Sequence, residues 1–529
     1  MSRTDIEIAA FHDGSGPSIP QAERTESVRA SPTAQPEVSK ARSEHLTSST
    51  AIRPLYIDGQ WRQGSEGAWV EDINPATGLA FARIAQASAA DVEDAIAAAH
   101  RARTGWAAML AGEREALLLK MADVIASRAD EIRDLIIQEN GSVFIKAPWE
   151  VGYAVECLRV AAGLARHVGG DTFPATNTGL LSMTIRQPLG VIAGIAPFNS
   201  PFLLTMKKVA FALAAGNTFV LKPSELTPLS GLIMAECFEQ AGVPPGVFNV
   251  IPGPAEIVGT KLVADPRVRM VTFTGSGRVG RLLAAQAGAQ MKRFTLEMGG
   301  KNPLVVLADA DLTYAVDSAA FGIFFHQGQV CMANSKVIVE APLMAKFAEA
   351  FTAKAKTIKV GDPRDPTTVV GPLIRPQQCV FIAGQIAEAV AKGATVLTGG
   401  TYEGAFFQPT VLAGVTPEMS IYHEESFGPV TSLIEARDSE HALEIANDTA
   451  YGLSSAIVTN DLQKAFDFAL RSEAGMVHIN DTTIADEPHI AFGGVKGSGV
   501  GREGGRASIE EMTELKWITV QLGKRAYPF

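Results

Sequence analysis

The chain has 529 residues, which is too long for one simple hydrophobic core, so we expect two or three domains. Hydrophobic residues make up 47% of the sequence and charged residues 19%, which is typical of a globular protein with a large core. The formal net charge of −11 argues against a nucleic-acid-binding protein, because such proteins present basic patches to phosphate groups.

The first 52 residues differ in composition from the rest of the chain. They are rich in Ser, Thr, Ala, Pro, Glu and Arg, and Phe11 is their only aromatic residue. Such a segment buries too little apolar surface to offset the entropy lost on ordering, so it is predicted to be a disordered tail. It lacks the apolar core of a secretory signal, and the early Asp5 and Glu7 are unlike a mitochondrial presequence.

From about residue 55, short apolar runs alternate with longer helical patterns. Strands are expected at residues 190–195, 218–221, 270–273, 303–307 and 336–340. Helices are expected at residues 229–240 and 344–357, and Asp91 is expected to cap another. Buried strands that alternate with helices predict parallel α/β sheets. Residues 171–190 and 516–523 look extended, and residues 512–520 end with apolar alternation. Pairing with another subunit is one way to cover a terminal strand of this kind.

Four cysteines are spread along the chain without a CxxC pair: Cys157, Cys237, Cys331 and Cys379. This spacing indicates neither a disulfide scaffold nor a zinc site, so no metal ion is expected. Free thiols suit a reducing compartment, which points to the cytoplasm. The apolar residues 202–215 are interrupted by Lys207 and Lys208, so no membrane span is predicted.

Three residues have the chemistry of a covalent acyl-transfer site. Cys331 would attack a carbonyl carbon once its thiol, whose ordinary pKa is about 8.5, is ionised. Glu297 would act as a general base, and the Met-Gly-Gly that follows would let it change position. Asn199, between two prolines, would donate a hydrogen bond to an oxyanion. Taken singly, each has an ordinary alternative, as core filler, surface carboxylate or turn residue.

A glycine-rich turn at residues 275–280 follows a predicted strand and matches GxGxxG by letter. Such glycines let the backbone approach a pyrophosphate at a helix N-terminus, but a plain strand–helix turn fits equally well. An ordinary Rossmann site needs a ribose-binding acid about 20 residues later, and the first acid is Glu297, already the candidate base. Lys222 and Glu225, after another strand, either hold ribose hydroxyls, which favours NAD, or form a polar turn.

Together and in this order, the motifs resemble the aldehyde dehydrogenase superfamily over nearly all of the chain from about Leu55 to Val520. The matching segments are Asn-Pro-Ala-Thr-Gly (74–78), Pro-Phe-Asn (197–199), Lys-Pro-Ser-Glu (222–225), Phe-Thr-Gly-Ser (273–276), Leu-Glu-Met-Gly-Gly-Lys (296–301), Gly-Gln-Val-Cys (328–331), Glu-Glu-Ser-Phe-Gly-Pro (424–429), Phe-Gly-Gly-Val-Lys (492–496) and Gly-Arg-Glu (501–503). The resemblance implies that Cys331 is the nucleophile and that Glu297 activates the water that hydrolyses its thioester. Asn199 and the backbone N–H of Cys331 would form the oxyanion hole.

The resemblance also implies a set of cofactor and proton-relay residues. Around NAD, with NADP as the alternative, these are Lys222 and Glu225 at the adenosine ribose, Ile195 along the cleft, Gly275, Ser276 and Gly280 by the pyrophosphate, and Glu425 and Phe427 at the nicotinamide riboside. Lys208 and Glu503 match positions that relay protons. Four residues depart from the family pattern, with Phe198 for Trp, Gly277 for Thr, His326 for Asn and Lys336 for Arg.

The implied fold is α/β, with a parallel-sheet cofactor domain, a catalytic domain and a bridging β-arm that forms homodimers or homotetramers. The expected limits are a tail at 1–52, an NAD-binding domain at 53–167 and 190–298, a catalytic domain at 299–505, and an oligomerisation arm at 168–189 and 506–529. No nucleic acid or membrane partner is expected.

The expected function is NAD-dependent oxidation of an aldehyde to its acid. Residues 478–481 and 486–489 resemble the aromatic branch of the family, such as the benzaldehyde, vanillin and salicylaldehyde dehydrogenases. Phe198, Phe325 and Phe492 would line an apolar tunnel, or are ordinary core residues.

Four alternatives stay open. The substrate is an aliphatic aldehyde or semialdehyde, or the acyl group passes to coenzyme A, which the presence of Glu297 disfavours. A hydrolase would use His326 as a base for Cys331, although we interpret this histidine as structural. The last alternative is a scaffold without catalytic activity.

Overall fold

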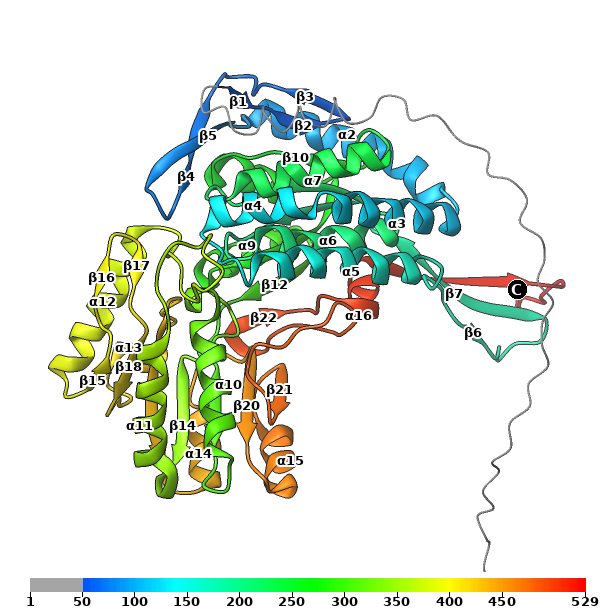
Figure 1. Ribbon diagram of the computed structural model, residues 1–529. Helices are drawn as coiled ribbons and strands as arrows, with labels where there is room; N and C mark the ends of the chain where they lie inside the picture. The colour runs from blue at the N-terminus through cyan, green and yellow to red at the C-terminus, as the bar shows by residue number, and fades with distance from the viewer. Residues whose placement is uncertain (1–50) are drawn as a thin grey trace, which may run out of the picture. The chain divides into compact units, whose positions relative to one another are not determined.

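The computed structural model describes residues 51–529; the predicted tail falls outside the described residues except at its end, where β1 (Ile52–Arg53) begins. Within residues 51–529 the strands form five sheets, of which two are large (Figure 1). In the same range, every helix is too short or too polar to cross a membrane.

The first large sheet has eight strands and is mostly parallel. Its order is β22 (Gly499–Val500), β12 (Arg293–Met298), β11 (Val268–Gly275), β8 (Val191–Ile195), β9 (Thr218–Lys222), β10 (Phe248–Val250), β2 (Leu55–Ile57) and β3 (Gln60–Arg62). The strands from β12 to β10 are parallel, whereas β22 and the β2–β3 hairpin pair antiparallel at the two edges. The late strand β22 therefore completes the sheet that carries the predicted cofactor residues.

Helices cover both faces of this sheet, because successive strand residues are apolar on opposite sides. Ile192 and Phe219 face one cluster, formed with α3 (Ala111–Ser127), α4 (Ala129–Asn140), α5 (Ala147–Ala165), α6 (Pro201–Ala214) and α7 (Pro228–Ala241). Val191 and Val220 face another, formed with α2 (Ala89–Ala108), α8 (Thr260–Ala264) and α9 (Gly277–Ala289).

The second large sheet has seven strands in the order β15 (Thr395–Thr398), β18 (Thr410–Ala413), β19 (Val430–Ala436), β14 (Lys336–Glu340), β13 (Pro303–Val306), β20 (Ser454–Val458) and β21 (Met476–Ile479). Only β15 pairs antiparallel. One face packs against α10 (Leu312–Phe324) and α11 (Ala341–Thr357), and the other against α12 (Pro376–Ala391), α14 (Ser439–Asn447) and α15 (Leu462–Arg471). The predicted α/β class is confirmed, and all five predicted strands are present.

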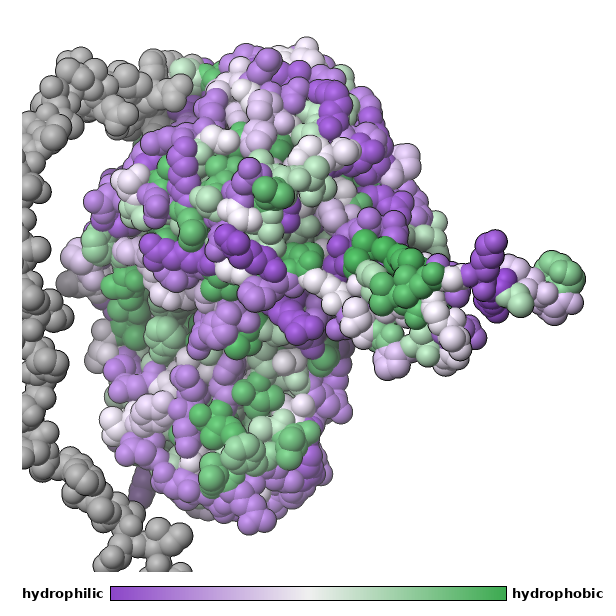
Figure 2. All heavy atoms as spheres, turned by 90° about the vertical axis from the view of Figure 1, so that its right-hand side faces the viewer, coloured by the Kyte–Doolittle hydropathy of each residue, from purple (hydrophilic) through white to green (hydrophobic). Residues whose placement is uncertain are grey.

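Three smaller sheets complete the fold. The strands are β1, β5 (Leu79–Ala85) and β4 (Trp69–Asn74) in one, β16 (Tyr402–Glu403) and β17 (Phe406–Phe407) in the next, and β23 (Thr513–Gln521), β7 (Leu180–Pro188) and β6 (Thr172–Phe173) in the last. The last sheet, which we call the arm sheet, joins the two segments that the sequence predicted to be extended. Figure 2 looks onto the side of Figure 1 that carries it, and hydrophobic side chains gather on that face. Short helical segments are η1 (Ala255–Gly259), η2 (Phe325–Gly328), α13 (Ser420–His423), η3 (Lys496–Ser498) and α16 (Gly505–Glu511).

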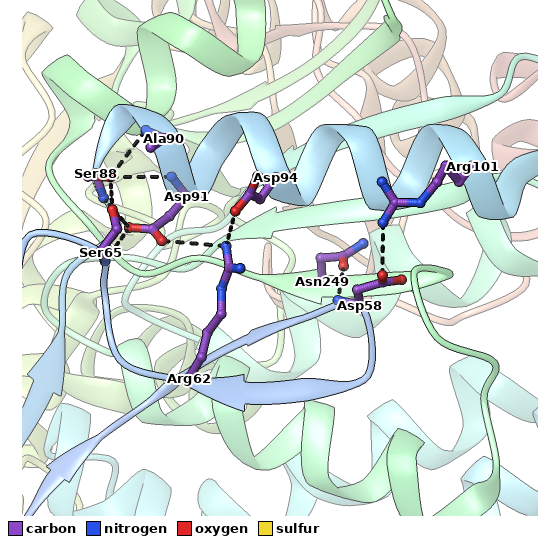
Figure 3. A network of polar contacts seen from close by, with 9 residues as sticks. All are labelled: Asp58, Arg62, Ser65, Ser88, Ala90, Asp91, Asp94, Arg101 and Asn249. Carbon is purple, nitrogen blue, oxygen red and sulfur yellow. Dashed lines mark hydrogen bonds and ion pairs between the residues drawn. The ribbon is translucent and has the colours of Figure 1, made fainter.

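Helix α2 shows how a local signal was misassigned. Its N-cap is Ser88, whose Oγ accepts hydrogen bonds from the backbone N–H groups of Ala90 (3.1 Å) and Asp91 (3.3 Å) (Figure 3). The Asp91 carboxylate accepts in return from the Ser88 N–H (2.9 Å). The predicted cap at Asp91 is therefore wrong, because Asp91 is the third helical residue of a capping box. Its carboxylate also binds Ser65 and Arg62, which ties the helix to the end of β3.

Candidate active site

Cys331 lies in the loop between η2 and β14 and keeps part of its surface exposed. The Asn302 amide fixes this loop, since its Nδ2 donates to the carbonyls of Cys331 (2.8 Å) and Ala333 (3.0 Å). Phe492 and Ile484 pack in one apolar cluster with the cysteine. The other three cysteines of the chain are buried, so Cys331 is the thiol that a substrate can reach.

The residues just before Cys331 have an unusual backbone. His326 and Gln327 have φ angles of 49° and 57°, in the left-handed region that disfavours residues with a Cβ atom. Long-range hydrogen bonds hold them there. His326 Nε2 donates to the Asn199 carbonyl (2.7 Å), and Gln327 Nε2 donates to two other backbone carbonyls (3.1 and 3.0 Å). The His326 ring is therefore engaged with Asn199.

Asn199 is fixed at both its side chain and its backbone. Its Nδ2 donates to the Gln329 carbonyl in the cysteine loop (3.0 Å). Its own carbonyl accepts from Lys146 Nζ (3.1 Å), Asn140 Nδ2 (3.2 Å) and His326 Nε2 (2.7 Å). An amide nitrogen carries two hydrogens, so one N–H of this oriented group remains for a ligand.

A buried ion pair supports the Asn199 backbone from behind. Lys146 and Glu150 lie one helical turn apart at the start of α5, and both side chains are at most 1% exposed. Glu150 Oε1 accepts from the backbone N–H groups of Phe202 (3.0 Å) and Leu203 (3.2 Å) in the first turn of α6. The pair therefore caps the helix that follows Asn199 while its ammonium group holds the Asn199 carbonyl.

Glu297, on β12, differs from Asn199 because no hydrogen bond from the described residues holds its side chain. Its side chain is buried, and neither carboxylate oxygen accepts a hydrogen bond from any residue of the described range 51–529. Burial and then the nearby charge of Glu503 raise its pKa well above the ordinary value, against the opposing charges of Lys208 and Lys207. A buried carboxyl group whose pKa is raised and whose acceptor positions are open has the properties of a general base for water.

Lys208 and Glu503 form a fully buried ion pair beside it. Thr272 Oγ1 donates to the same Glu503 oxygen (2.9 Å), and the other oxygen has no partner in the part of the chain that the structure describes. A Cβ atom at Gly493 would lie 2.7 Å from Glu297 Oε1 and 2.8 Å from Arg502, the residue before Glu503, so Glu297 lies in the same region as the pair. The structure thus brings together the residues that the resemblance implied as base and relay.

The Cys331 thiol is in an electrostatically unfavourable place for ionisation. Burial raises its pKa to about 12, and the charges of Glu297, Glu425 and Asp486 add to the effect while Lys207 opposes it. The free protein therefore holds a protonated thiol at neutral pH. Ionisation needs a base or a positive charge brought next to the sulfur.

Three of the predicted cofactor residues lie at the carboxyl ends of neighbouring parallel strands. Ile195 ends β8 and pairs in register with Lys222 at the end of β9, and Gly275 ends β11. Lys222 Nζ lies 3.3 Å from Glu225 Oε1, which also accepts from the Ala255 N–H (2.8 Å). Dinucleotides bind at this edge of α/β sheets.

The glycine-rich turn at residues 275–280 also allows α9 to pack closely against β12. Ser276 is the N-cap of α9, and its side chain accepts from the Val279 N–H. A Cβ atom at Gly280 would lie 2.3 Å from the sulfur of Met298 on β12. A side chain at Gly280 would therefore push α9 away from the sheet.

Glu425 explains Gly299, the first of the two glycines that follow Glu297 and Met298. It is half-buried, and its Oε1 accepts from the Gly300 N–H (3.1 Å). Burial raises its pKa to about 7, against the Gly300 hydrogen bond and the charge of Lys301. A Cβ atom at Gly299 would lie 2.1 Å from the Glu425 carboxylate. The glycine that the sequence assigned to movement of Glu297 is therefore also required to make room for Glu425.

The aromatic residues predicted to line a tunnel have different neighbours. Phe198 lies edge-on to Phe427 (ring centroids 5.8 Å apart), whose own backbone is left-handed with φ 51°. Phe325 lies edge-on to Trp149 (6.4 Å), and Phe492 packs near the cysteine as described above. The tunnel itself stays a prediction.

Sequence reasoning missed several residues that hold the site: Asn140, Lys146, Glu150, Asn302 and Gln329. Through the resemblance it assigned Lys208 to a proton relay, but it noted Lys207 only as an interruption of an apolar run. That observation was the one available signal, because charged residues in a fully buried helix must have partners.

The comparisons agree with this geometry. Residues 61–518 match the aldehyde dehydrogenase family model. The chain is 43% identical to a vanillin dehydrogenase of Pseudomonas fluorescens and 42% identical to a benzaldehyde dehydrogenase of Bacillus subtilis, each over 90% of this chain and 99% of the relative. A solved salicylaldehyde dehydrogenase from Pseudomonas putida G7, complexed with salicylaldehyde, superposes with a TM-score of 0.88 at 37% identity, over 90% of this chain and 100% of that one. The resemblance seen in the motifs is confirmed, and the chain belongs to the aldehyde dehydrogenase family.

Proposed function

We propose that this protein oxidises an aromatic aldehyde to its carboxylic acid with NAD, through a thioester on Cys331. The carrying observation is the convergence of an accessible cysteine, an immobilised Asn199 amide and an unpartnered Glu297 carboxyl group. Relatives named for vanillin, benzaldehyde and salicylaldehyde support the aromatic substrate.

Enzymes of this family use NAD or NADP, and the residues at the strand ends fit such a group. Lys222 and Glu225 offer a cation and a carboxylate to ribose hydroxyls, and the start of α9 offers backbone N–H groups to a pyrophosphate. The carboxylate favours a free 2′-hydroxyl, hence NAD over NADP. When bound, the cofactor accepts the hydride from the aldehyde carbon.

The chain's own groups carry the remaining chemistry. The Cys331 thiol gives its proton to water and its sulfur bonds to the carbonyl carbon, and the Asn199 amide with the Cys331 N–H stabilises the oxyanion. Once the thioester has formed, Glu297 takes a proton from the attacking water, and the acid leaves as the carbon–sulfur bond breaks. We assign the onward passage of that proton to Lys208 and Glu503, and their ion pair and its effect on the Glu297 pKa support this role.

A hydrolase that uses His326 as its base has less support. The His326 Nε2 donates to the Asn199 carbonyl, and burial and the charge of Lys146 hold its pKa well below the ordinary value. The ring therefore supports Asn199, in line with the structural interpretation. Transfer of the acyl group to coenzyme A is disfavoured because Glu297 is present beside the cysteine.

An aldehyde panel with NAD and NADP tests the proposal. We expect the highest kcat/KM for benzaldehyde and its derivatives with NAD, free acid as product, and no ester cleavage without nucleotide. A higher kcat/KM for aliphatic aldehydes or semialdehydes would contradict the aromatic assignment, while acyl-CoA as product would contradict the hydrolytic one.

We also propose that the arm sheet pairs copies of the chain into homodimers or homotetramers. It exposes large apolar side chains, namely Phe173, Leu181, Leu515, Trp517 and Val520. Unpaired strand edges and exposed apolar patches favour association. Light scattering of the protein and of a Leu515→Asp/Trp517→Asp variant tests the assembly, and an unchanged mass would contradict it.

Four free cysteines support a location in the reducing cytoplasm.

A further inference from the structure

One buried charged pair next to the cysteine has no task in the chemistry above. Lys207 Nζ contacts both carboxylate oxygens of Asp486 (2.7 and 2.6 Å) and the Tyr153 hydroxyl (3.4 Å). The Lys207 side chain is fully buried and that of Asp486 is 7% exposed. Taking two charges out of water is unfavourable, and their attraction often fails to compensate, so stability alone explains such a pair poorly.

The pair and the cysteine lie against the same aromatic residue. Lys207 Nζ is 4.1 Å from the centroid of the Phe492 ring, and Phe492 belongs to the apolar cluster that includes Cys331. The charges of Lys207 and Asp486 also act in opposite directions on the pKa of the Cys331 thiol, which Lys207 lowers and Asp486 raises. A substrate ring attached to the carbon that the sulfur attacks would therefore extend into the surroundings of Phe492 and the pair.

The hydrogen-bonding capacity of the pair identifies the kind of group it can take. A carboxylate accepts about four hydrogen bonds, so Asp486 has acceptor positions beyond those that Lys207 fills. The donors of Lys207 point at Asp486 and Tyr153. A negatively charged substituent would meet the Asp486 charge, whereas a hydroxyl would add a donor to it.

We propose that Asp486, held in place by Lys207, accepts a hydrogen bond from a hydroxyl group on the ring of the substrate. The pair thereby selects hydroxylated aromatic aldehydes over benzaldehyde itself. This inference rests on the proposed aromatic substrate and adds a specificity-determining pair to it.

The test compares kcat/KM for 3- and 4-hydroxybenzaldehyde with kcat/KM for benzaldehyde on the same preparations. In the unaltered protein we expect one of the hydroxylated aldehydes to be preferred by about tenfold or more, as in sites built around a substrate hydroxyl. In Lys207→Met/Asp486→Leu, which removes both charges together and leaves neither unpaired, the ratio should fall to about one. Asp486→Asn, which keeps an acceptor without the charge, should give an intermediate ratio.

Glu487→Gln is the matched control, because it makes the same chemical change one residue further along on an exposed side chain. Its ratio should equal that of the unaltered protein. An equal loss for all three aldehydes in the double variant would mean that the pair only supports the loop, and would overturn the inference. So would a preference that survives in the double variant, or no preference in the unaltered protein. Benzaldehyde oxidation by the unaltered protein separates these results from failure of the proposed function, which would show as no aromatic oxidation at all.

Discussion

Asn199 contacts the loop that carries Cys331, the charge of Glu297 acts on the Cys331 thiol, and the surroundings of the two groups are opposite. Asn199 makes four hydrogen bonds, and a buried ion pair and a strained histidine support its backbone. Glu297 is as deeply buried, yet the described residues offer its carboxylate no hydrogen bond. Both groups are removed from bulk solvent, but only one is held in place.

The difference matches what each group would have to do. A donor to an oxyanion works best when it is oriented before charge develops, because no reorganisation is then needed. A base that activates water must leave room for that water and exchange a proton with it. The unpaired Glu297 would be costly in a structural site, so its isolation is best explained by function.

Removing the sulfur that both groups serve should have the largest effect. In Cys331→Ala, aldehyde oxidation should fall by about 10⁶-fold, because no covalent intermediate can form. Nucleotide binding, followed by fluorescence titration, should remain. Turnover within tenfold of the unaltered protein would end the thioester scheme.

Removing the carboxylate of Glu297 should separate thioester formation from thioester hydrolysis. In Glu297→Gln, kcat should fall by about 10²–10⁴-fold, because the thioester forms but its hydrolysis loses the base. Stopped-flow absorbance should show one equivalent of nucleotide reduced per site in a burst, followed by a slow phase. Equal slowing of both phases would assign Glu297 to the first step instead.

Removing the amide of Asn199 should slow both chemical steps, because each step passes through an oxyanion that the amide stabilises. In Asn199→Ala, kcat/KM should fall by about 10²–10³-fold, with the burst itself slowed. Glu297→Gln measured beside it is the comparison, since that variant keeps a fast burst. A normal burst rate in Asn199→Ala would contradict the role of the amide.

Removing one of the donors that hold the Asn199 carbonyl should lower the rate less than removing Asn199 itself. In Lys146→Met the Asn199 carbonyl loses its charged donor while keeping those from Asn140 and His326, so we expect kcat to fall by about tenfold with little change in KM. The free energy of unfolding should also decrease, by about 3–5 kcal/mol, because Glu150 is left buried without its cation. Chemical denaturation measures the second effect separately. An unaltered kcat in the folded variant would show that the other donors suffice.

The smallest effect concerns the charge next to Glu297. The negative charge of Glu503 raises the Glu297 pKa, so in Glu503→Gln the ionised form becomes easier to reach and Lys208 is left free to favour it further. The rise of the deacylation rate with pH should therefore move to lower pH. Glu510→Gln, at an exposed side chain, is the control. A shift to higher pH would contradict the electrostatic assignment.

Most of the fold followed from local patterns. The buried strands at 191–195 and 218–222 are runs of apolar residues without a helical period. The structure has these strands within one residue of the predicted positions. The cap of α2 was misplaced because Ser88 and Asp91 are both good N-cap residues, and only the reciprocal bonds of the capping box distinguish them.

The reacting groups were predictable and their supports were not. Cys331, Glu297 and Asn199 stand in recognisable motifs. Lys146 and Glu150, by contrast, have the spacing of an ordinary surface pair on a helix, and only the packing of α6 over them makes the pair buried. The left-handed backbone at His326 depends on a contact with a residue 127 positions away, which no local preference encodes.

Because only one of the four cysteines is accessible, a thiol titration can count the intact reactive centres in a preparation. A thiol reagent in excess at alkaline pH should consume one equivalent per folded chain, at Cys331, and four after denaturation. The first count, per folded chain, gives the fraction of chains whose reactive thiol is intact, without any aldehyde, and converts bulk rates into rates per working subunit.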